Sequence, residues 1–220
     1  MQTKSNIIIF ICFFTTIFLL SKSIQAEEFD IKASEIEIDK KNNTLTATGS
    51  VEARDKKGKI ITADKIFYER SKELLNIEGN VNIIDADGNI LKTSKAAYDK
   101  LNNKIITYEN TQLEFGDGYS LITNSILYDT LEKIISSNQN TNFIDSDGNK
   151  IQATMFQYLI KENMFSSIGE ITVVDINKNK YLFKELHVDT KKKEMIGSDI
   201  SAVLDQENFG LTKKSDPRFV

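Results

Sequence analysis

The sequence predicts an all-β fold made of about five similar units of roughly 30 residues each. Tyrosines recur at a constant step, at Tyr68, Tyr98, Tyr128 and Tyr158, and Val188 takes the next place in the series. Between them apolar and polar residues alternate, and turns rich in Asp and Gly separate the runs. A fixed period in this range is typical of stacked supersecondary units. Alternation with a period of two is typical of half-buried strands.

The composition favours one folded domain of good size. The chain has 220 residues, 40% of them hydrophobic, with one Pro, ten Gly and no Trp, so proline and glycine are too scarce to predict disorder. The net charge is −4 with acids and bases interspersed, which gives no indication of a nucleic-acid surface. One His and one Cys leave little material for a metal site or a catalytic triad. We therefore expect no enzyme, no metal site and no cofactor.

Residues 1–26 are typical of a secretory signal peptide. Lys4 precedes an apolar run from Ile7 to Leu20, and the small residue Ala26 offers a cleavage position before Glu27. The run is shorter than the roughly 20 residues that an uncleaved membrane anchor needs. Cys12 lies inside the run, so the exported chain is expected to contain no cysteine and to fold without disulfides.

From residue 29 onwards the apolar runs predict strands separated by tight turns. A first strand is expected over 29–38, a second over 45–53 and a returning strand over 60–68. The same strand–turn–strand pattern then recurs, and no amphipathic helix is expected. Asp-Gly between alternating apolar runs is the strongest short hairpin signal. The later turns are expected at Asp87-Gly88, Asp117-Gly118, Asp147-Gly148 and Asn177-Lys178-Asn179.

Superposing the repeats shows a change of inward parity inside each returning run, around Asp64, Ser94, Asn124 and Thr154. Such a switch predicts a bulge or a bend. Each repeat is therefore expected to give one strand to each of two facing sheets, which form an open β-sandwich or roll about ten strands long. After a two-residue slip in the first copy, one apolar column of the outgoing runs is expected to contain Val51, Ile83, Leu113, Phe143 and Val173.

Two motifs that suggest chemistry have simpler structural explanations. His187 is the only histidine, and no nucleophile or carboxylate partner is suggested for it, so we expect it to face outward. Residues 85–89 (DADGN) and 145–149 (DSDGN) superficially suggest calcium loops. They lack the later glycine and the distal Glu of an EF-hand, and a hairpin turn explains them.

The tyrosine column allows two interpretations. Aromatic residues on the same face of successive repeats would stabilise any stacked sheet. A tyrosine also presents an apolar ring and a polar tip, which suits the lining of an amphipathic cavity. The sequence leaves both open.

The first predicted strand also allows two interpretations. Charged side chains alternate along it, as on an ordinary solvated edge. Its unpaired backbone groups would equally suit the addition of a partner's strand. The residues predicted for this docking edge are Ile31, Ala33, Ile36 and Ile38.

Short segments of the chain resemble one known family. They are Ile31–Ile36 (IKASEI), Leu45–Val51 (LTATGSV), Ile61–Ile66 (ITADKI), Ala63–Tyr68 (ADKIFY) and Gly79-Asn80-Val81. These segments resemble the organic-solvent-tolerance-protein N-terminal domain, also called the lipopolysaccharide-transport β-jellyroll or β-taco. The resemblance extends from residue 27 to about residue 211.

The resemblance implies an open β-jellyroll that binds the acyl chains of lipopolysaccharide in a groove between two sheets. It also implies that neighbouring transport domains join edge to edge by strand addition. Glu109 and Gln139 replace the family's glycine and the fifth copy lacks the tyrosine, so these copies are expected to pack differently. The groove residues that the resemblance implies are Ile66, Tyr68, Ile83, Tyr98, Leu113, Tyr128, Phe143, Phe156 and Tyr158.

Two kinds of family member fit the chain. One is a soluble bridge protein of the periplasm, and the other is an outer-membrane assembly protein in which the same domain precedes a membrane barrel. Residues 212–220, which contain Pro217, resemble the linker to such a barrel, so the second kind is favoured, with 27–211 as the jellyroll domain. Both place the chain in the periplasm. The alternative from another class is a structural β-solenoid or surface-repeat protein with a dry core and no lipid ligand.

Overall fold

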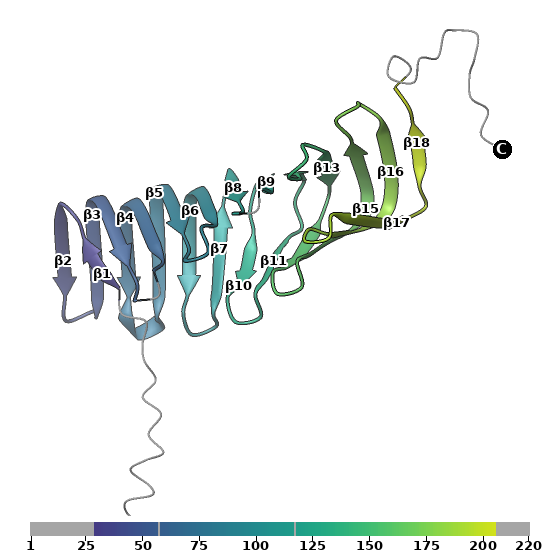
Figure 1. Ribbon diagram of the computed structural model, residues 1–220. Helices are drawn as coiled ribbons and strands as arrows, with labels where there is room; N and C mark the ends of the chain where they lie inside the picture. Colours follow the sequence, from purple (N-terminus) through teal and green to yellow (C-terminus); the bar gives the residue numbers. More distant parts are fainter. Residues whose placement is uncertain (1–28, 57, 117, 206–220) are drawn as a thin grey trace, which may run out of the picture.

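The computed structural model describes residues 29–56, 58–116 and 118–205. The predicted signal peptide and the predicted tail at 212–220 lie outside these residues. The described chain is all-β, with eighteen strands and one short 3-10 helix, η1 (Arg70–Lys72). The strands follow one another along the long axis of the molecule, from β2 at one end to β18 at the other (Figure 1). None of the described residues forms a helix with the length and apolar character to cross a bilayer.

Long strands lie on both sides of a middle region of short strands, and short strands also form the two ends of the series. The long strands are β3 (Thr44–Arg54), β4 (Ile60–Glu69), β5 (Leu74–Ile84), β6 (Ile90–Asp99), β15 (Met164–Val174) and β16 (Lys180–Asp189). The short middle strands are β7 (Lys104–Tyr108), β8 (Thr111–Glu114), β9 (Ser120–Thr123), β10 (Leu127–Asp129), β11 (Ile134–Ser137), β12 (Thr141–Ile144), β13 (Lys150–Ala153) and β14 (Phe156–Leu159). The terminal strands are β1 (Asp30–Lys32), β2 (Glu35–Asp39), β17 (Glu194–Ser198) and β18 (Ser201–Val203).

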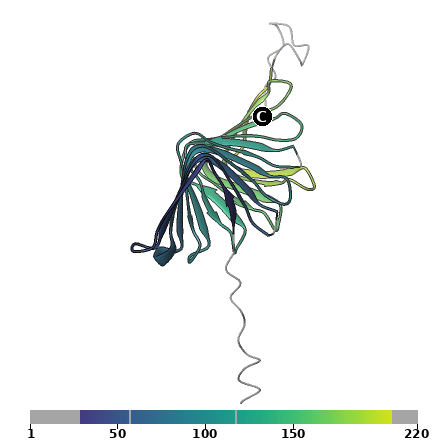
Figure 2. The same cartoon turned by 90° about the vertical axis from the view of Figure 1, so that its left-hand side faces the viewer.

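The strands pair antiparallel in two ladders. Ladder A contains β2, β7, β10, β11, β14 and β17, and ladder B contains β1, β8, β9, β12, β13 and β18. Each long strand bends in its middle and gives one half to each ladder. Viewed along the long axis, the strands converge on a common bend, which we call the crease, and two arms diverge from it (Figure 2).

The parity switch predicted from the sequence is confirmed at the crease. In β4, Ala63 and Ile66 are both buried, while Asp64 and Lys65 between them are exposed. The pairing of β4 with β5 shifts register at the same place. The prediction that each repeat gives one strand to each sheet is wrong. Because both strands of a long hairpin cross the crease, each repeat gives two half-strands to each ladder.

Left-handed backbone conformations make the crease in β5. Gly79 and Asn80 have φ angles of 75° and 47°, and the Asn80 side-chain amide donates to Asp64 Oδ2 on β4 at 2.9 Å. A Cβ atom at Gly79 would lie 2.8 Å from the Cβ of Asp64, so this close approach requires glycine. In the next repeat Glu109 and Asn110 take the same left-handed conformation, with φ of 63° and 49°.

The middle repeats cross the crease differently, as expected from their missing glycines. Here the strands are interrupted at the crease. Side-chain hydroxyl groups form hydrogen bonds with backbone N–H and C=O groups that would otherwise be unpaired at the interruption. Thr107 Oγ1 accepts the N–H of Ile126 at 2.9 Å, and Ser137 Oγ donates to the carbonyl of Ser125 at 2.7 Å. Thr107 also lies 2.7 Å from the hydroxyl of Thr111 across the crease. Buried hydroxyls therefore stabilise the bend where the sequence lacks glycine.

Two predictions for the first repeat need correction. The segment 29–38 was expected as one strand, but it forms β1 in ladder B and β2 in ladder A. Ser34 between them donates from N and Oγ to the carbonyl of Gly49, both at 2.9 Å, so this segment also bends at the crease. In the apolar column, Ala53 rather than Val51 pairs with Ile61 and continues to Ile83. The two-residue slip is therefore unnecessary.

The hairpin interpretation of the supposed calcium loops is confirmed. Asp85 Oδ1 accepts the backbone N–H groups of Asp87 at 3.0 Å and Asn89 at 2.9 Å. Asp145 makes the same contacts in its own repeat. These aspartates stabilise their turns in the way that Asx turns do.

The crease glycine gives a first prediction. Gly79→Ala should lower the free energy of unfolding by about 1–3 kcal/mol, because it places a side chain in a left-handed conformation and against Asp64. Glu109→Gly, at the equivalent place in the next repeat, is the matched control and should leave the free energy unchanged or slightly higher. Urea denaturation followed by circular dichroism measures both. An equal loss in the two variants would contradict the strain argument.

Candidate functional site

The inner face of each ladder contains one continuous row of directly paired residues. In ladder A the tyrosines alternate with aliphatic residues of the neighbouring strands as far as Tyr158, which pairs with Phe165. This row contains Leu45, Tyr68, Leu75, Tyr98, Ile105, Tyr128, Ile135, Tyr158, Phe165 and Val188. The facing row of ladder B contains Ala53, Ile61, Ile83, Leu91, Leu113, Leu121, Phe143, Ile151, Val173 and Tyr181.

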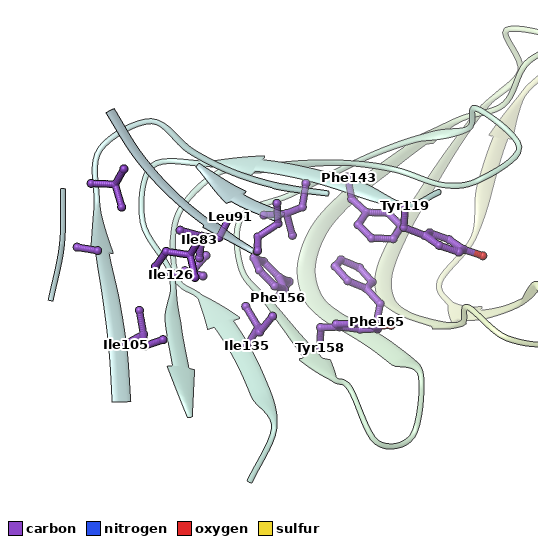
Figure 3. Close-up of a cluster of buried hydrophobic side chains, with 14 of the residues drawn as sticks. Ile83, Leu91, Ile105, Tyr119, Ile126, Ile135, Phe143, Phe156, Tyr158 and Phe165 are labelled. Atoms are coloured by element: carbon purple, nitrogen blue, oxygen red, sulfur yellow. The ribbon is translucent and has the colours of Figure 1, made fainter. Parts of the chain in front are cut away.

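A groove of about 850 Å³ lies between the two rows. Its ladder B wall includes Ile83, Leu91 and Leu113, and its ladder A wall includes Tyr98 and Ile105, with Tyr128, Ile126 and Ile135 further along. In Figure 3 the labelled aliphatic side chains lie together on one side of the cluster, and the labelled aromatic rings lie on the other. The inside of the groove is therefore apolar.

The mouth of the groove is mixed in character. Exposed leucines, Leu101 and Leu131, lie on the turns of ladder A, at 67% and 65% exposure. The charged residues at the mouth are Asp55, Lys59, Glu73, Asp85, Asp87, Lys100 and Lys133. The site is thus apolar inside and polar at its opening, which is typical of a site for an amphipathic molecule.

A lysine lies over each of the first three tyrosine rings of the column. The Nζ atoms of Lys100 and Lys59 lie 5.6 Å and 5.4 Å from the ring centroids of Tyr68 and Tyr98. Lys133 Nζ lies 5.9 Å from the Tyr128 centroid and donates to its hydroxyl at 3.3 Å. These distances are within the range of cation–π interactions.

Tyr68, Glu73 and Lys100 form a charged cluster at one end of the mouth. The Tyr68 hydroxyl donates to Glu73 Oε2 at 2.8 Å, and Lys100 Nζ donates to the same oxygen at 2.8 Å. These bonds, that of Lys100 first, lower the pKa of Glu73. Burial, with the hydrogen bond to Glu73, raises the pKa of Tyr68 to about 12. Tyr68 is therefore held neutral and Glu73 ionised.

The structure brings only part of the predicted groove set to the groove. Ile83, Tyr98, Leu113 and Tyr128 line it. Ile66 is fully buried at the crease, and Tyr68 lies beside the groove in the charged cluster. Phe143, Phe156 and Tyr158 belong instead to an aromatic cluster in the next part of the chain.

Sequence reasoning missed several wall residues. They are Leu91, Ile105, Phe115, Ile126, Ile135 and Ile160. Ile105 pairs directly with both Tyr98 and Tyr128, so the register of the hairpins would have identified it. Leu91 and Ile126 already belong to columns that stay apolar in every repeat, which was an available signal.

Both ends of the ladders have strands with only one partner. Among the described residues, β1 and β2 pair only with β3, and β17 and β18 pair only with β16. Of the predicted docking residues, Ile36 and Ile38 are exposed, while Ile31 and Ala33 pack partly against the core. Unpaired strand edges of this kind can accept a further strand.

His187 lies on the outer face of ladder A, half-exposed as expected. Its Nδ1 lies 2.9 Å from Ser166 Oγ and its Nε2 lies 3.0 Å from Glu185 Oε1, partners that the sequence did not predict. The three side chains lie across the surface of β15 and β16, remote from the groove walls. Within the described part of the chain, no three His, Cys, Asp or Glu side chains gather as metal ligands would.

No family model and no curated protein matches the sequence. Among solved structures, the chain is similar to LptH from Pseudomonas aeruginosa, described as the LptA-homologous periplasmic component of the lipopolysaccharide transport device. The identity is 12% and the TM-score 0.24, over 81% of this chain and 96% of that one. It is also similar to the TCP10 domain of Danio rerio CPAP in complex with a STIL peptide, at 12% identity and a TM-score of 0.16, over 77% and 97%. TM-scores this low establish no common fold.

The charged cluster gives a second prediction. Because the folded-state pKa of Tyr68 lies above its ordinary value of about 10, its contribution to stability is complete below about pH 10 and is lost as the pH rises to about 12. Glu73→Gln should lower the pKa of Tyr68 but leave it above the ordinary value, since burial is the larger cause. The difference in tyrosinate absorbance between each protein and its Tyr68→Phe counterpart isolates this phenol. An unchanged pKa in the Glu73 variant would contradict the cluster.

Proposed function

We propose that this chain is a β-jellyroll of the lipopolysaccharide-transport type, which binds the acyl chains of lipopolysaccharide between its two ladders. The observation that carries the proposal is the 850 Å³ groove with apolar walls and a charged mouth. The short segments that resemble the family support it. The acyl chains would contact Leu91, Leu113 and Ile105, and the phosphates and sugars would lie outside near the lysines at the mouth.

The apolar walls make acyl chains the favoured ligand chemistry. Burial of a methylene group contributes about 0.8 kcal/mol, so a long chain gains substantial affinity without any directional contact. A protein with a dry core would fill the space between its sheets with its own side chains. In the open part of this groove the protein's own side chains do not fill the space between the ladders. This favours a ligand site over the structural β-solenoid.

The proposal includes a location and a partner class. Lipopolysaccharide transport places the chain in the periplasm, associated with the outer membrane if it continues into a barrel. The single-partner edge strands at both ends suit addition of strands from other transport β-jellyrolls. No step of this function requires catalysis or a cofactor, and we propose that the chain is not an enzyme.

Photo-crosslinking tests the ligand. We expect p-benzoylphenylalanine at Tyr128, in the groove wall, to capture purified lipopolysaccharide. The matched control is the same residue at Ile122, an exposed apolar position on the outer face of β9, where we expect no capture. Equal labelling at the two positions would contradict a groove-specific ligand. No labelling at Tyr128 would favour the dry-core alternative.

Proline substitution tests the edge. Ile36→Pro removes a backbone donor from β2 and should abolish binding of a partner β-jellyroll if β2 accepts the partner's strand. The remaining strands should stay folded, because β2 pairs only with β3 among the described residues. Ile36→Ala, which retains the donor, is the control and should bind normally. Sedimentation of mixtures measures binding, and normal binding by the proline variant would place the docking edge elsewhere.

A further inference from the structure

The groove ends at a cluster of aromatic rings that spans the two ladders. We call it the plug: Phe115, Tyr119, Phe143, Phe156, Tyr158 and Phe165. Two contacts cross from ladder to ladder. Phe115 meets Tyr158 edge to face at 5.1 Å, and Phe143 stacks on Phe165 at 4.8 Å between centroids. Figure 3 shows the labelled rings filling the space beside Ile126 and Ile135.

Two polar contacts hold the turns of the ladders together above the plug. The Tyr119 hydroxyl donates to the carbonyl of Thr190 at 2.9 Å, and Lys193 Nζ lies 2.8 Å from Asp147 Oδ1. Tyr119 and Asp147 belong to the turns β8–β9 and β12–β13 of ladder B, whereas Thr190 and Lys193 belong to the turn β16–β17 of ladder A. We call this pair of contacts the clasp. It closes the mouth over the plug.

The apolar walls do not end where the groove ends. Beyond the plug the ladder B row continues through Ile151 and Val173 to Tyr181, and the ladder A row continues to Val188. These residues face inward like the groove walls, and Tyr181 packs against the core only in part. The rows of the walls therefore continue past the plug, and the cavity ends where their aliphatic side chains give way to the rings of the plug under the clasp.

The open part of the groove holds a limited amount of ligand. An apolar cavity of about 150 Å³ takes up one benzene molecule. At the same filling, 850 Å³ holds about 34 carbon atoms, or about two chains of 16 carbons. A lipid with more than two long chains needs more room than the open part provides.

The closure is of a kind that can be reversed. The Lys193–Asp147 pair is half-exposed on both sides, so it contributes little to stability. The rings of the plug contact one another through their apolar surfaces, while the hydroxyls of Tyr119 and Tyr158 contact Thr190. An acyl chain replaces the contacts between rings with others of the same chemistry. Separating the rings of the plug to admit an apolar chain therefore costs less free energy than separating them to admit water.

We propose that the plug and the clasp form a gate, and that the apolar walls behind it are a second acyl-chain segment of the groove. This inference rests on the proposed function, since it extends the same groove. The gate opens when a lipid with more than two long chains is loaded or passed on. Tyr181, which lies behind the gate, then contacts the lipid.

Locking the clasp tests the gate. Cys12 is the only cysteine of the sequence and precedes the predicted cleavage position, so Asp147→Cys/Lys193→Cys gives a unique pair in the exported chain. A short bis-maleimide with a reducible centre joins the two cysteines. p-Benzoylphenylalanine at Tyr128 reports the open groove, and at Tyr181 the segment behind the gate. We expect the unlocked protein to capture lipopolysaccharide at both positions.

In the locked protein, capture at Tyr181 should be lost while capture at Tyr128 persists, and reduction should restore it. Tyr119→Phe, which retains the ring and removes the hydrogen bond to Thr190, should increase capture at Tyr181 without any cross-linker. Equal capture at Tyr181 in locked and unlocked protein, or none in either, would overturn the gate. Absence of capture at Tyr128 would overturn the proposed function itself, and the gate with it.

Discussion

The bend at the crease is the constraint on which the rest of the structure depends. In a straight strand with alternating apolar residues, all the apolar side chains point to one face, so the strand can contribute to the core of one sheet only. The bulge shifts the inward parity, so that Ala63 and Ile66, three positions apart in one strand, are both buried between the ladders. Without that shift, one half of every long strand would expose its apolar face. The facing rows, and therefore the groove, exist because each long strand changes parity once.

The chain makes this bend by two chemical routes. Where the outgoing strand has glycine, the backbone takes a left-handed conformation, and Asp64 packs directly against Gly79. Where glycine is missing, the strand breaks, and buried hydroxyls such as those of Thr107 and Ser137 bond to the backbone at the break. Glu109 and Asn110 keep the left-handed conformation beside such a break. A buried hydroxyl without such a partner would destabilise the fold, whereas a paired one is close to neutral. The inward-facing rows of both ladders therefore stay continuous through repeats whose sequences at the crease differ.

The repeat, the turns and the parity switch could be predicted because each depends on residues close together in the sequence. The division of 29–38 into β1 and β2 could not, because it depends on pairing with two separate halves of β3. Phe143 and Phe156 were predicted to line the groove from their places in the repeat. Whether such rings line an open groove or fill the space depends on the distance between the ladders, which the period of the sequence does not give. One local signal was available: Phe115 and Tyr119 occupy the turn positions where Asp85 and Asn89 stand in the preceding copy. In the other copies the side chains at these turn positions form hydrogen bonds within the turn. Aromatic residues there cannot do so in the same way, which indicates a contact across the mouth of the groove.

Side-chain size along two rows decides where the space between the ladders is open. Successive repeats place Ala53, Ile83, Leu113 and then Phe143 at one position of ladder B. Ladder A likewise changes from Ile105 and Ile135 to Phe165. Aliphatic side chains leave room between the walls, and rings of the same rows meet across it. A block built from charged residues would exclude an acyl chain permanently, because burying a charge beside hydrocarbon is costly. A block built from rings closes the same space and stays chemically compatible with the chain that would displace it.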